Sequence, residues 1–322
     1  MAAEQVQQLT QLETIRLGCV PEHFCSPVFQ AVQKGVFGQY GLKVEVVNCP
    51  GGTGEMVNML NNDQLDVAIA LTEGLVASLS NEDGLFRIIG TYVSSPLTWS
   101  IATSPSGRLG QSPREGLGPD AWEPLKNAKI GISRLGSGSH IIPFVLADRM
   151  GWLNNGTEPF TFTPLSNITG LVNGVKTGAV DAFLWERIMT KPYYDSGELH
   201  HLSNITPPWP AFLFAATQKA LAHKKALSTM LEVITQMSVS FMDGREGASI
   251  LYVAERFQLP EDDVRTWFSA VAYPQDSREV SAKVLQECIS VLKKAGVISD
   301  KEAEIPFDRL VDTGVAALVD IP

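Results

Sequence analysis

Two short stretches of this chain carry residue types that suit the binding of a small polar molecule. The first, residues 22–26, places a carboxylate, an imidazole, an aromatic ring and a hydroxyl on one predicted loop. Such a set can hydrogen-bond to a polar ligand and stack against its ring, and binding residues concentrate on loops of this kind. The alternative is a solvated loop with its aromatic ring packed inward. We predict that the ligand contacts here are Glu22, His23, Phe24 and Ser26.

The second stretch, Ser137-Gly138-Ser139-His140, lies between a predicted strand and a predicted helix. Backbone N–H groups at a helix start, together with two hydroxyls, suit a phosphate, a sulfonate or a carboxylate. Ordinary capping by serine is the alternative, and it requires no ligand. We predict that Ser137, Ser139 and His140 contact the acidic end of the ligand, where it has one.

Further candidates follow two apolar runs that are typical of buried strands. Thr72 and Glu73 follow the first run, and Trp185 and Glu186 follow the second. An aromatic ring and carboxylates on opposite sides of a cleft can sandwich a flat or cationic group. Alternatively, the tryptophan packs in a hinge and the glutamates face water. The remaining predicted ligand contacts are Thr53, Trp99 and Asn167.

Three glutamates in one cleft disfavour a simple dianion as the ligand, because like charges repel. Arg134 and Arg187 are the basic residues that can offset these carboxylates. The alternative is that both arginines lie on the surface.

Catalytic residues, metal ligands and cofactors are not predicted. Cys25 with His23 or His140 is a conceivable nucleophile–base pair, but no third residue is evidently placed to orient the base. We therefore expect an ordinary, unreactive thiol at Cys25. The spacings of the four cysteines match no zinc pattern, and no two of the five histidines stand four residues apart. The simplest interpretation of the cysteines is free, mostly buried thiols.

The elements that position these residues follow one plan twice. Corresponding landmarks are Ile15 and Ile130, Thr53 and Thr169, and Asp66 and Asp181, which are 115, 116 and 115 residues apart. This offset predicts two β-α-β-α-β lobes of one design with a cleft between them. Ligands of open α/β sheets bind beyond the carboxyl ends of the strands, so the cleft is the expected site.

The order of the segments predicts a discontinuous first lobe. We assign residues 1–98 and 213–322, with helices at the C-terminal end, to lobe 1, and residues 99–212 to an inserted lobe 2. The chain crosses between lobes near Ser94-Ser95-Pro96 and Trp209-Pro210, which we predict to be hinges. Residues 103–120 are rich in Gly, Pro and Ser and predict an exposed loop.

Composition excludes several classes of partner. The chain has 322 residues, 44% hydrophobic and 19% charged, with a net charge of −10. An acidic surface without a basic run repels nucleic acid and anionic membranes. No apolar run approaches the roughly 20 residues that span a bilayer. The N-terminal residues show no signal-peptide pattern, so we expect a cytoplasmic protein without a transporter partner.

Four segments resemble a known family. Residues 29–47 resemble its "helix, Gly, small loop, Gly-Leu, strand" signature, and residues 60–70 its "helix end, acidic residue, buried strand" element. Residues 217–220 resemble the end of its return strand, and residues 267–298 its terminal helices. The family has the type II periplasmic-binding-protein fold and binds sulfonates, taurine, nitrate and thiamine-pyrimidine precursors. The resemblance implies an α/β fold of two lobes, each a mixed, mostly parallel sheet flanked by helices, with a cleft between them.

The resemblance also bears on function. The loop Pro21-Glu22-His23-Phe24 resembles a cytosolic, fungal branch of the family. Enzymes of the family that make the thiamine pyrimidine carry a cysteine-rich cluster, which this sequence lacks. We therefore expect a cytosolic small-molecule binding protein that closes on a polar or heteroaromatic metabolite, such as a thiamine-pyrimidine-precursor-like or sulfonate-like ligand. The alternative is an enzyme on the same scaffold, in thiamine-pyrimidine metabolism or an aromatic elimination.

Overall fold

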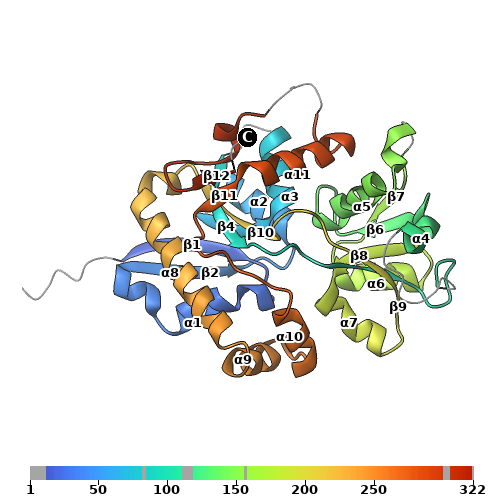
Figure 1. The fold of residues 1–322 in the computed structure, drawn as a ribbon, viewed down its shortest axis with the longest axis horizontal. Helices are drawn as coiled ribbons and strands as arrows, with labels where there is room; N and C mark the ends of the chain where they lie inside the picture. Colours follow the sequence, from blue (N-terminus) through green and yellow to red (C-terminus); the bar gives the residue numbers. More distant parts are fainter. Residues whose placement is uncertain (1–11, 82–84, 111–118, 156–157, 300–304, 321–322) are drawn as a thin grey trace, which may run out of the picture.

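The computed structural model describes residues 12–81, 85–110, 119–155, 158–299 and 305–320. Two lobes lie side by side, and each is built around one five-stranded sheet (Figure 1). The predicted loop at 103–120 falls partly outside the described residues, because positions 111–118 are not among them.

The sheet of lobe 1 has the strand order β2-β1-β3-β10-β4. β1 pairs in parallel with β2 and with β3, whereas β10 runs antiparallel between β3 and β4. β3 and β10 consist almost wholly of buried apolar residues, as expected for central strands covered on both faces. The strands are β1 (Glu13–Cys19), β2 (Leu42–Asn48), β3 (Val67–Leu71), β4 (Phe86–Val93) and β10 (Phe212–Thr217).

The sheet of lobe 2 repeats this design with the order β7-β6-β8-β5-β9. β6 pairs in parallel with β7 and β8, and β5 is the antiparallel strand between β8 and β9. In each lobe the antiparallel strand is the one that enters from the other lobe. The predicted two-lobed α/β fold is thereby confirmed. The strands are β5 (Trp99–Thr103), β6 (Lys129–Ile132), β7 (Thr161–Pro164), β8 (Ala182–Glu186) and β9 (His200–Ile205).

Helices follow the same duplication. α1 (Ser26–Gln33), α2 (Thr53–Asn61) and α3 (Thr72–Asn81) connect the strands of lobe 1. The corresponding helices of lobe 2 are α5 (Gly138–Arg149), α6 (Ile168–Lys176) and α7 (Arg187–Asp195), and α4 (Pro119–Trp122) is a single short turn. The predicted loop at residues 22–26 is largely helical, because a 3-10 turn covers His23–Cys25 and α1 begins at Ser26.

The C-terminal third packs onto lobe 1 and reaches lobe 2. Helix α11 shows why such a segment is helical: Ser281 caps it by accepting from the N–H of Val284, apolar side chains recur along one face, and it ends before Gly296 at φ 67°. α11 and α3, on the lobe 1 side, both contact α5 of lobe 2 (Figure 1). The elements are α8 (Lys224–Asp243), α9 (Ala248–Phe257), α10 (Glu261–Phe268), β11 (Glu279–Ser281), α11 (Ala282–Lys294), α12 (Phe307–Leu310) and β12 (Ala317–Val319).

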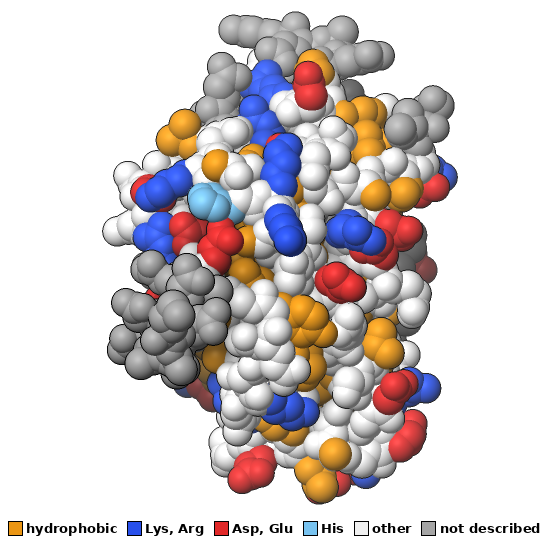
Figure 2. Space-filling view, turned by 90° about the vertical axis from the view of Figure 1, so that its left-hand side faces the viewer, with side chains coloured by type: hydrophobic (Ala, Val, Ile, Leu, Met, Phe, Trp, Pro, Cys, Tyr) orange, Lys and Arg blue, Asp and Glu red, His pale blue; other side chains and the backbone are white. Residues whose placement is uncertain are grey.

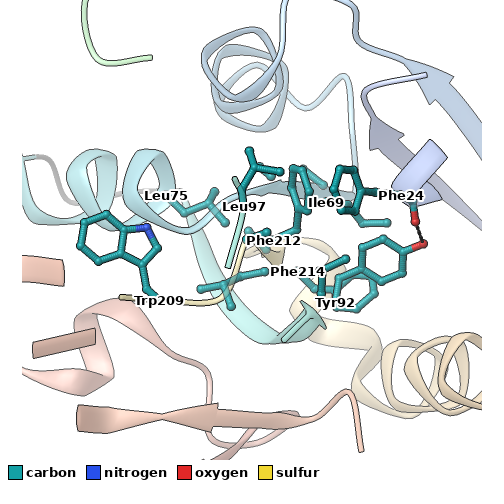
Figure 3. Close-up of a cluster of buried hydrophobic side chains, with 14 of the residues drawn as sticks. Phe24, Ile69, Leu75, Tyr92, Leu97, Trp209, Phe212 and Phe214 are labelled. Carbon is teal, nitrogen blue, oxygen red and sulfur yellow. Dashed lines mark hydrogen bonds between the residues drawn. The ribbon is translucent and has the colours of Figure 1, made fainter. Parts of the chain in front are cut away.

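Aromatic side chains dominate the core of lobe 1 beneath the cleft. Figure 3 shows Phe24 beside Phe212, with Tyr92 and Phe214 packed next to them. The Tyr92 hydroxyl donates to the Phe24 carbonyl at 2.7 Å, drawn as a dashed line. Trp209 lies at the other end of this cluster. The cluster thus joins the loop after β1, strand β10 and the crossing segment before it.

Two segments, 94–98 and 206–211, cross between the lobes, and both are fastened to lobe 1. The Ser94 hydroxyl donates to the Ala272 carbonyl at 3.1 Å, and the Ala211 N–H donates to the Ser95 carbonyl at 3.0 Å. The indole N–H of Trp209 donates to Glu73 at 2.9 Å. Lobe 2 holds the other ends, because the Thr98 carbonyl accepts from the Arg187 N–H at 3.0 Å and the Thr206 carbonyl accepts from Arg149 at 2.5 Å. We therefore expect hinge bending within the two segments, between these attachments.

The outer face of lobe 1, away from the cleft, mixes charges of both signs with scattered apolar side chains (Figure 2). Ion pairs such as Arg16–Asp66 at 2.8 Å and Lys219–Asp63 at 2.8 Å neutralise part of the charge. Within the described residues, no helix has the length and apolar character to cross a membrane.

Candidate functional site

A cavity lies between the lobes, at the carboxyl ends of β1, β2, β3, β6 and β8, where α/β sheets bind ligands. The space open to the centre of a water-sized sphere is about 80 Å³. That corresponds to roughly five to eight waters at about 10–15 Å³ each, so a compact group fits. Lobe 1 and the hinge contribute Val20, Glu22, Pro50, Gly51, Gly52, Thr53, Leu71, Leu97 and Phe212. Lobe 2 contributes Trp99, Ser133, Arg134, Ser137, Gly138, Ser139, Trp185 and Glu186.

Two carboxyls from opposite lobes face this cavity. Glu22 follows β1 and is partly exposed at the cavity wall, and no hydrogen bond among the described residues engages its carboxyl. Desolvation, and secondly the nearby charge of Glu186, raise the pKa of Glu22 to about 8. At neutral pH this carboxyl is therefore mostly protonated and can donate as well as accept.

Glu186 ends β8 and caps α7. Its carboxylate accepts from the Met189 N–H at 2.7 Å, which fixes the side chain at the start of the helix. Burial raises the pKa of Glu186 to about 7, although backbone N–H groups and Arg187 act in the opposite direction. Glu186 is thus a positioned carboxyl whose charge is sensitive to what enters the cavity.

The loop before α5 forms a closed chain of hydroxyls. Ser137 donates to the Arg134 carbonyl at 2.8 Å, so its oxygen is an acceptor for Ser139 at 2.9 Å. Ser139 also accepts from the Ser133 N–H at 2.9 Å and lies 3.3 Å from the Ser133 hydroxyl. In this arrangement all three hydroxyl hydrogens are used within the loop. The His140 and Ile141 N–H groups donate to the Ser137 carbonyl, so the donors left for a ligand are the N–H groups of Gly138 and Ser139.

Arg134 reaches across the cleft from lobe 2. Its guanidinium donates to the Gly51 carbonyl in lobe 1, and burial lowers its pKa while Glu55 raises it. The glycine-rich turn is shaped for this contact. Gly52 has φ 72° and ψ −155°, a conformation open almost only to glycine, and a Cβ on Gly54 would lie 2.1 Å from Arg134 Nε.

Two buried donors in the cavity wall lack a partner among the described residues. They are the indole N–H of Trp99, a residue only 4% exposed, and the Nε–H of Arg134. A buried donor without an acceptor destabilises a protein by about 1–3 kcal/mol. Both residues belong to lobe 2 and line the cavity, whereas Glu22 lines it from lobe 1, and Arg134 Nε lies close to Gly54. A ligand with both an acceptor and a donor can therefore pair with groups of both lobes.

Seven of the predicted ligand contacts lie together in the cavity wall. Of these, Thr53 is already engaged, because its hydroxyl accepts from the Leu71 N–H at 3.0 Å. The seven are Glu22, Thr53, Trp99, Ser137, Ser139, Trp185 and Glu186.

The rest of the first predicted stretch points into the core. His23 is fully buried, neither ring nitrogen has a partner among the described residues, and its ring lies edge-on to Trp267 at 4.7 Å. Desolvation lowers the pKa of His23 to about 3. Phe24 packs against Phe212, and the Ser26 hydroxyl donates to the His23 carbonyl at 2.7 Å.

Four further predicted residues also lie outside the cavity wall. Thr72 donates to the Pro210 carbonyl at 2.5 Å and Glu73 accepts from Trp209, so both hold the hinge. His140 accepts from the Gly136 N–H at 3.1 Å and packs against an aromatic ring. Asn167 is an exposed helix cap that accepts from the Gly170 N–H.

Sequence reasoning missed part of the wall. It treated Arg134 as an optional counter-charge and did not select Ser133, Gly51, Gly52 or Phe212. The run Gly51-Gly52-Thr53-Gly54 was the available signal, because so many glycines at a helix start indicate a close approach by another group. The apolar wall residues resemble ordinary core residues in the sequence and carry no such signal.

Thiol and metal chemistry find little support in the described residues. Cys25 is buried, and its pKa is raised by a hydrogen bond with Cys19 and by burial, so little thiolate forms at neutral pH. The four cysteines are free and buried, in agreement with the sequence-based interpretation. Within the described ranges, no three His, Cys, Asp or Glu side chains are grouped to hold a metal ion.

Two family models match parts of the chain. The model described as "Ca3427-like PBP" matches residues 116–205, and the model of the "NMT1-like family" matches residues 9–82. A comparison with curated protein sequences finds no match.

Solved structures match nearly the whole chain. The Candida albicans CA3427 gene product, described as defining a new family with the generic periplasmic binding protein fold, is 28% identical, with a TM-score of 0.79 over 91% of this chain and 93% of that one. The alkanesulfonate-binding protein SsuA of Xanthomonas axonopodis pv. citri, bound to MOPS, is 16% identical, with a TM-score of 0.71 over 96% and 99%. The nitrate-binding protein NrtA of Synechocystis PCC 6803 is 15% identical, with a TM-score of 0.67 over 94% and 92%.

The duplicated sheets, the two crossing segments and the cavity between the lobes define a periplasmic-binding-protein fold with a ligand cleft. The fold is that of the type II periplasmic-binding-protein-like proteins, and parts of the chain match two family models of that kind.

Proposed function

We propose that this chain is a small-molecule binding protein whose two lobes close on a compact polar or heteroaromatic metabolite. The observation that carries the proposal is the set of unmatched groups in one cavity. Trp99 and Arg134 each present an unpaired donor on lobe 2, and the Glu22 carboxyl is unpaired on lobe 1. A ligand that touches both walls gains more in the closed form than in the open one, and therefore favours closure.

The wall chemistry favours a nitrogen-containing ring as the ligand. A ring nitrogen or carbonyl oxygen accepts from Trp99 or Arg134, an amino group donates to Glu22 or Glu186, and the rings of Trp185 and Phe212 supply apolar contact. This supports a thiamine-pyrimidine-precursor-like ligand, because such molecules combine a small aromatic ring with donors and acceptors.

A sulfonate-like ligand is the second candidate, and the start of α5 supports it. The free N–H groups there and the Arg134 guanidinium suit an acidic group, and SsuA of Xanthomonas axonopodis is an alkanesulfonate-binding protein of the same fold. Glu22 and Glu186 oppose a ligand that is acidic throughout. We therefore expect the acidic group of such a ligand to bind only at the end of the cavity formed by the start of α5.

An enzyme on this scaffold is the alternative, and the raised pKa of Glu22 is the observation that keeps it open. A carboxyl that is protonated at neutral pH and lacks a protein partner can act as a general acid. Prolonged incubation of the protein with its co-purified metabolite separates the possibilities. A binding protein leaves the metabolite's mass unchanged, whereas an enzyme converts it. The cytoplasmic location and the absence of a transporter partner stay predictions from the sequence.

Native mass spectrometry of freshly purified protein tests the binding proposal. We expect a small-molecule adduct on the wild-type chain, and less of it on Trp99→Phe and Glu22→Ala. Loss of one buried hydrogen bond to a ligand lowers affinity by roughly five- to a hundredfold. Glu232→Ala is the matched control, because this glutamate is exposed on α8, away from the cavity. An adduct that persists unchanged in both cavity variants contradicts the proposed site.

A further inference from the structure

The carboxyls of Glu22 and Glu186 come from different lobes, and the cavity they share depends on contact between those lobes. Arg134 of lobe 2 is bonded to Gly51 of lobe 1. Ion pairs also join the lobes on either side: Lys191 of α7 to Asp263 of α10 at 3.2 Å, and Lys294 of α11 to Asp148 of α5 at 3.0 Å. Opening the hinge therefore separates the two carboxyls and admits water to both.

The surroundings of the pair provide no cation for Glu22. Among the described residues that line the cavity, the only basic side chain is Arg134, which donates to the Gly51 carbonyl and interacts electrostatically with Glu55. The group behind Glu22 is the Cys25 thiol, which is neutral at neutral pH because its pKa is raised.

Glu186 is surrounded differently. It has Arg187 beside it in the chain and the Tyr194 hydroxyl nearby, and it keeps its bonds to the first turn of α7. Arg187 and these N–H groups stabilise its ionised form. The unmatched charge of the closed cleft is therefore that of Glu22, with Glu186 adding repulsion.

We propose that closure of the cleft is coupled to proton uptake by the Glu22–Glu186 pair. When the lobes part, water solvates both carboxylates. When they meet, two negative charges enter one small cavity, and a proton relieves their repulsion and desolvation. A second part rests on the proposed function: a donor or cationic nitrogen of the ligand takes the place of this proton.

The pKa shifts have the sign that this coupling requires. In the closed form the pKa is about 8 for Glu22 and about 7 for Glu186, whereas a hydrated glutamate has a pKa near 4.5. A group whose pKa rises on closing favours the closed form at low pH, and this advantage is lost as the pH rises through the raised pKa. Between about pH 5 and pH 8 the closing constant should fall by up to about tenfold per pH unit for each proton taken up.

Small-angle scattering of the ligand-free protein between pH 5.5 and pH 9 tests the coupling without any ligand. We expect the radius of gyration of the wild type to increase as the pH rises. Glu22→Gln should stay compact throughout, because a neutral amide replaces the carboxyl. Glu232→Gln is the matched control and should follow the wild type, since Glu232 is exposed on α8, away from the cavity and the hinge.

A radius of gyration that does not change with pH in the wild type overturns the proposal, whether the protein is open or closed throughout. So does a Glu22→Gln variant that expands as the wild type does. Infrared difference spectra of the wild type and of Glu22→Gln give a second readout. A protonated carboxyl band should be present at pH 7 in the wild type, be lost by pH 9, and be weaker in Glu22→Gln, because the buried Glu73 carboxyl contributes equally to both. Equal bands at pH 7 contradict the coupling. Because no ligand is used, this outcome is independent of whether the proposed function holds.

Discussion

Glu73 and Glu186 lie at the same strand-to-helix junction of the two lobes, two positions out of register with each other, and they have different roles in the hinge and the cleft. Each lies where the strand next to the antiparallel strand, β3 or β8, passes into the following helix. Each is buried with its pKa raised to about 7 by desolvation. Glu73 accepts from Trp209 and fastens a crossing segment, whereas Glu186 caps α7 and borders the cavity. Glu73 thus anchors a crossing segment to lobe 1, whereas Glu186 lines the cavity between the lobes.

His23 and His140 form a second such pair, after β1 and β6. His23 is fully buried among aromatic rings, whereas His140 is partly exposed and accepts from the Gly136 N–H. Desolvation lowers the pKa of both, to about 3 for His23. Neither ring lines the cavity. The difference teaches that a position after a strand does not decide whether a side chain turns into the core or toward the surface.

The largest expected effect comes from the tryptophans associated with the two glutamates. Trp209 is 1% exposed and bonded to Glu73, whereas Trp185 is partly exposed at the cavity wall. Trp209→Ala should lower the free energy of unfolding by about 3–5 kcal/mol, because it empties a packed site and leaves Glu73 unpaired. Trp185→Ala should cost clearly less stability and weaken ligand binding instead. Urea denaturation measures the free energy of unfolding of both variants. Equal losses of stability would contradict a structural role for Trp209 and a ligand-binding role for Trp185.

The histidines differ in their expected effect on acid stability. With a folded pKa of about 3, His23 stays neutral while its unfolded form binds a proton below about pH 6.5. Stability should therefore fall by about 1.4 kcal/mol per pH unit as the pH drops below 6.5. His23→Phe removes this contribution, and His223→Phe, at an exposed histidine, is the control. Chemical denaturation from pH 4 to 7 gives the free energy of unfolding at each pH. This free energy should fall less steeply with decreasing pH in His23→Phe than in the wild type, and equal slopes would show that His23 is uncharged in both states or in neither.

A smaller effect is expected at the glycine turn that receives Arg134. Gly54→Ala places a Cβ against the guanidinium, whereas Gly38→Ala meets nothing within 4 Å and is the control. Gly54→Ala should weaken ligand binding by about 1–3 kcal/mol, the worth of a displaced hydrogen bond to a charged group. Its effect on folding should be slight, because alanine favours helix α2. Calorimetry with the co-purified metabolite checks this, and unchanged affinity would mean that Arg134 does not shape the site.

The fold could be predicted from the sequence because its signals are local and repeated. Residue offsets near 115 identify β1 with β6 and β3 with β8, and the apolar run at Val67–Leu71 identifies a central strand. The Ser-Gly-Ser run after β6 likewise predicts a helix start, which the structure has at Gly138.

The details of the cleft could be predicted only in part. The ends of the strands determine which residues approach the cavity, so the positions of Glu22, Trp185 and Glu186 in its wall could be predicted from the sequence. They do not fix side-chain direction, which is why His23 and Glu73 were placed with the ligand although the first lies in the core and the second in the hinge. Arg134 contacts a residue far away in the sequence, and only the closed arrangement of the lobes brings the two together.

A crystal structure of the protein with its co-purified metabolite tests the central claim most directly. The account predicts the ligand between the lobes, with an acceptor atom on Trp99 Nε1 or Arg134 and a donor atom on Glu22. The second pocket behind the hinge, lined in part by Trp267 and Thr266, should be without this ligand. A metabolite bound there, or on the outer face of lobe 1, with the cleft filled by solvent alone, would contradict the account.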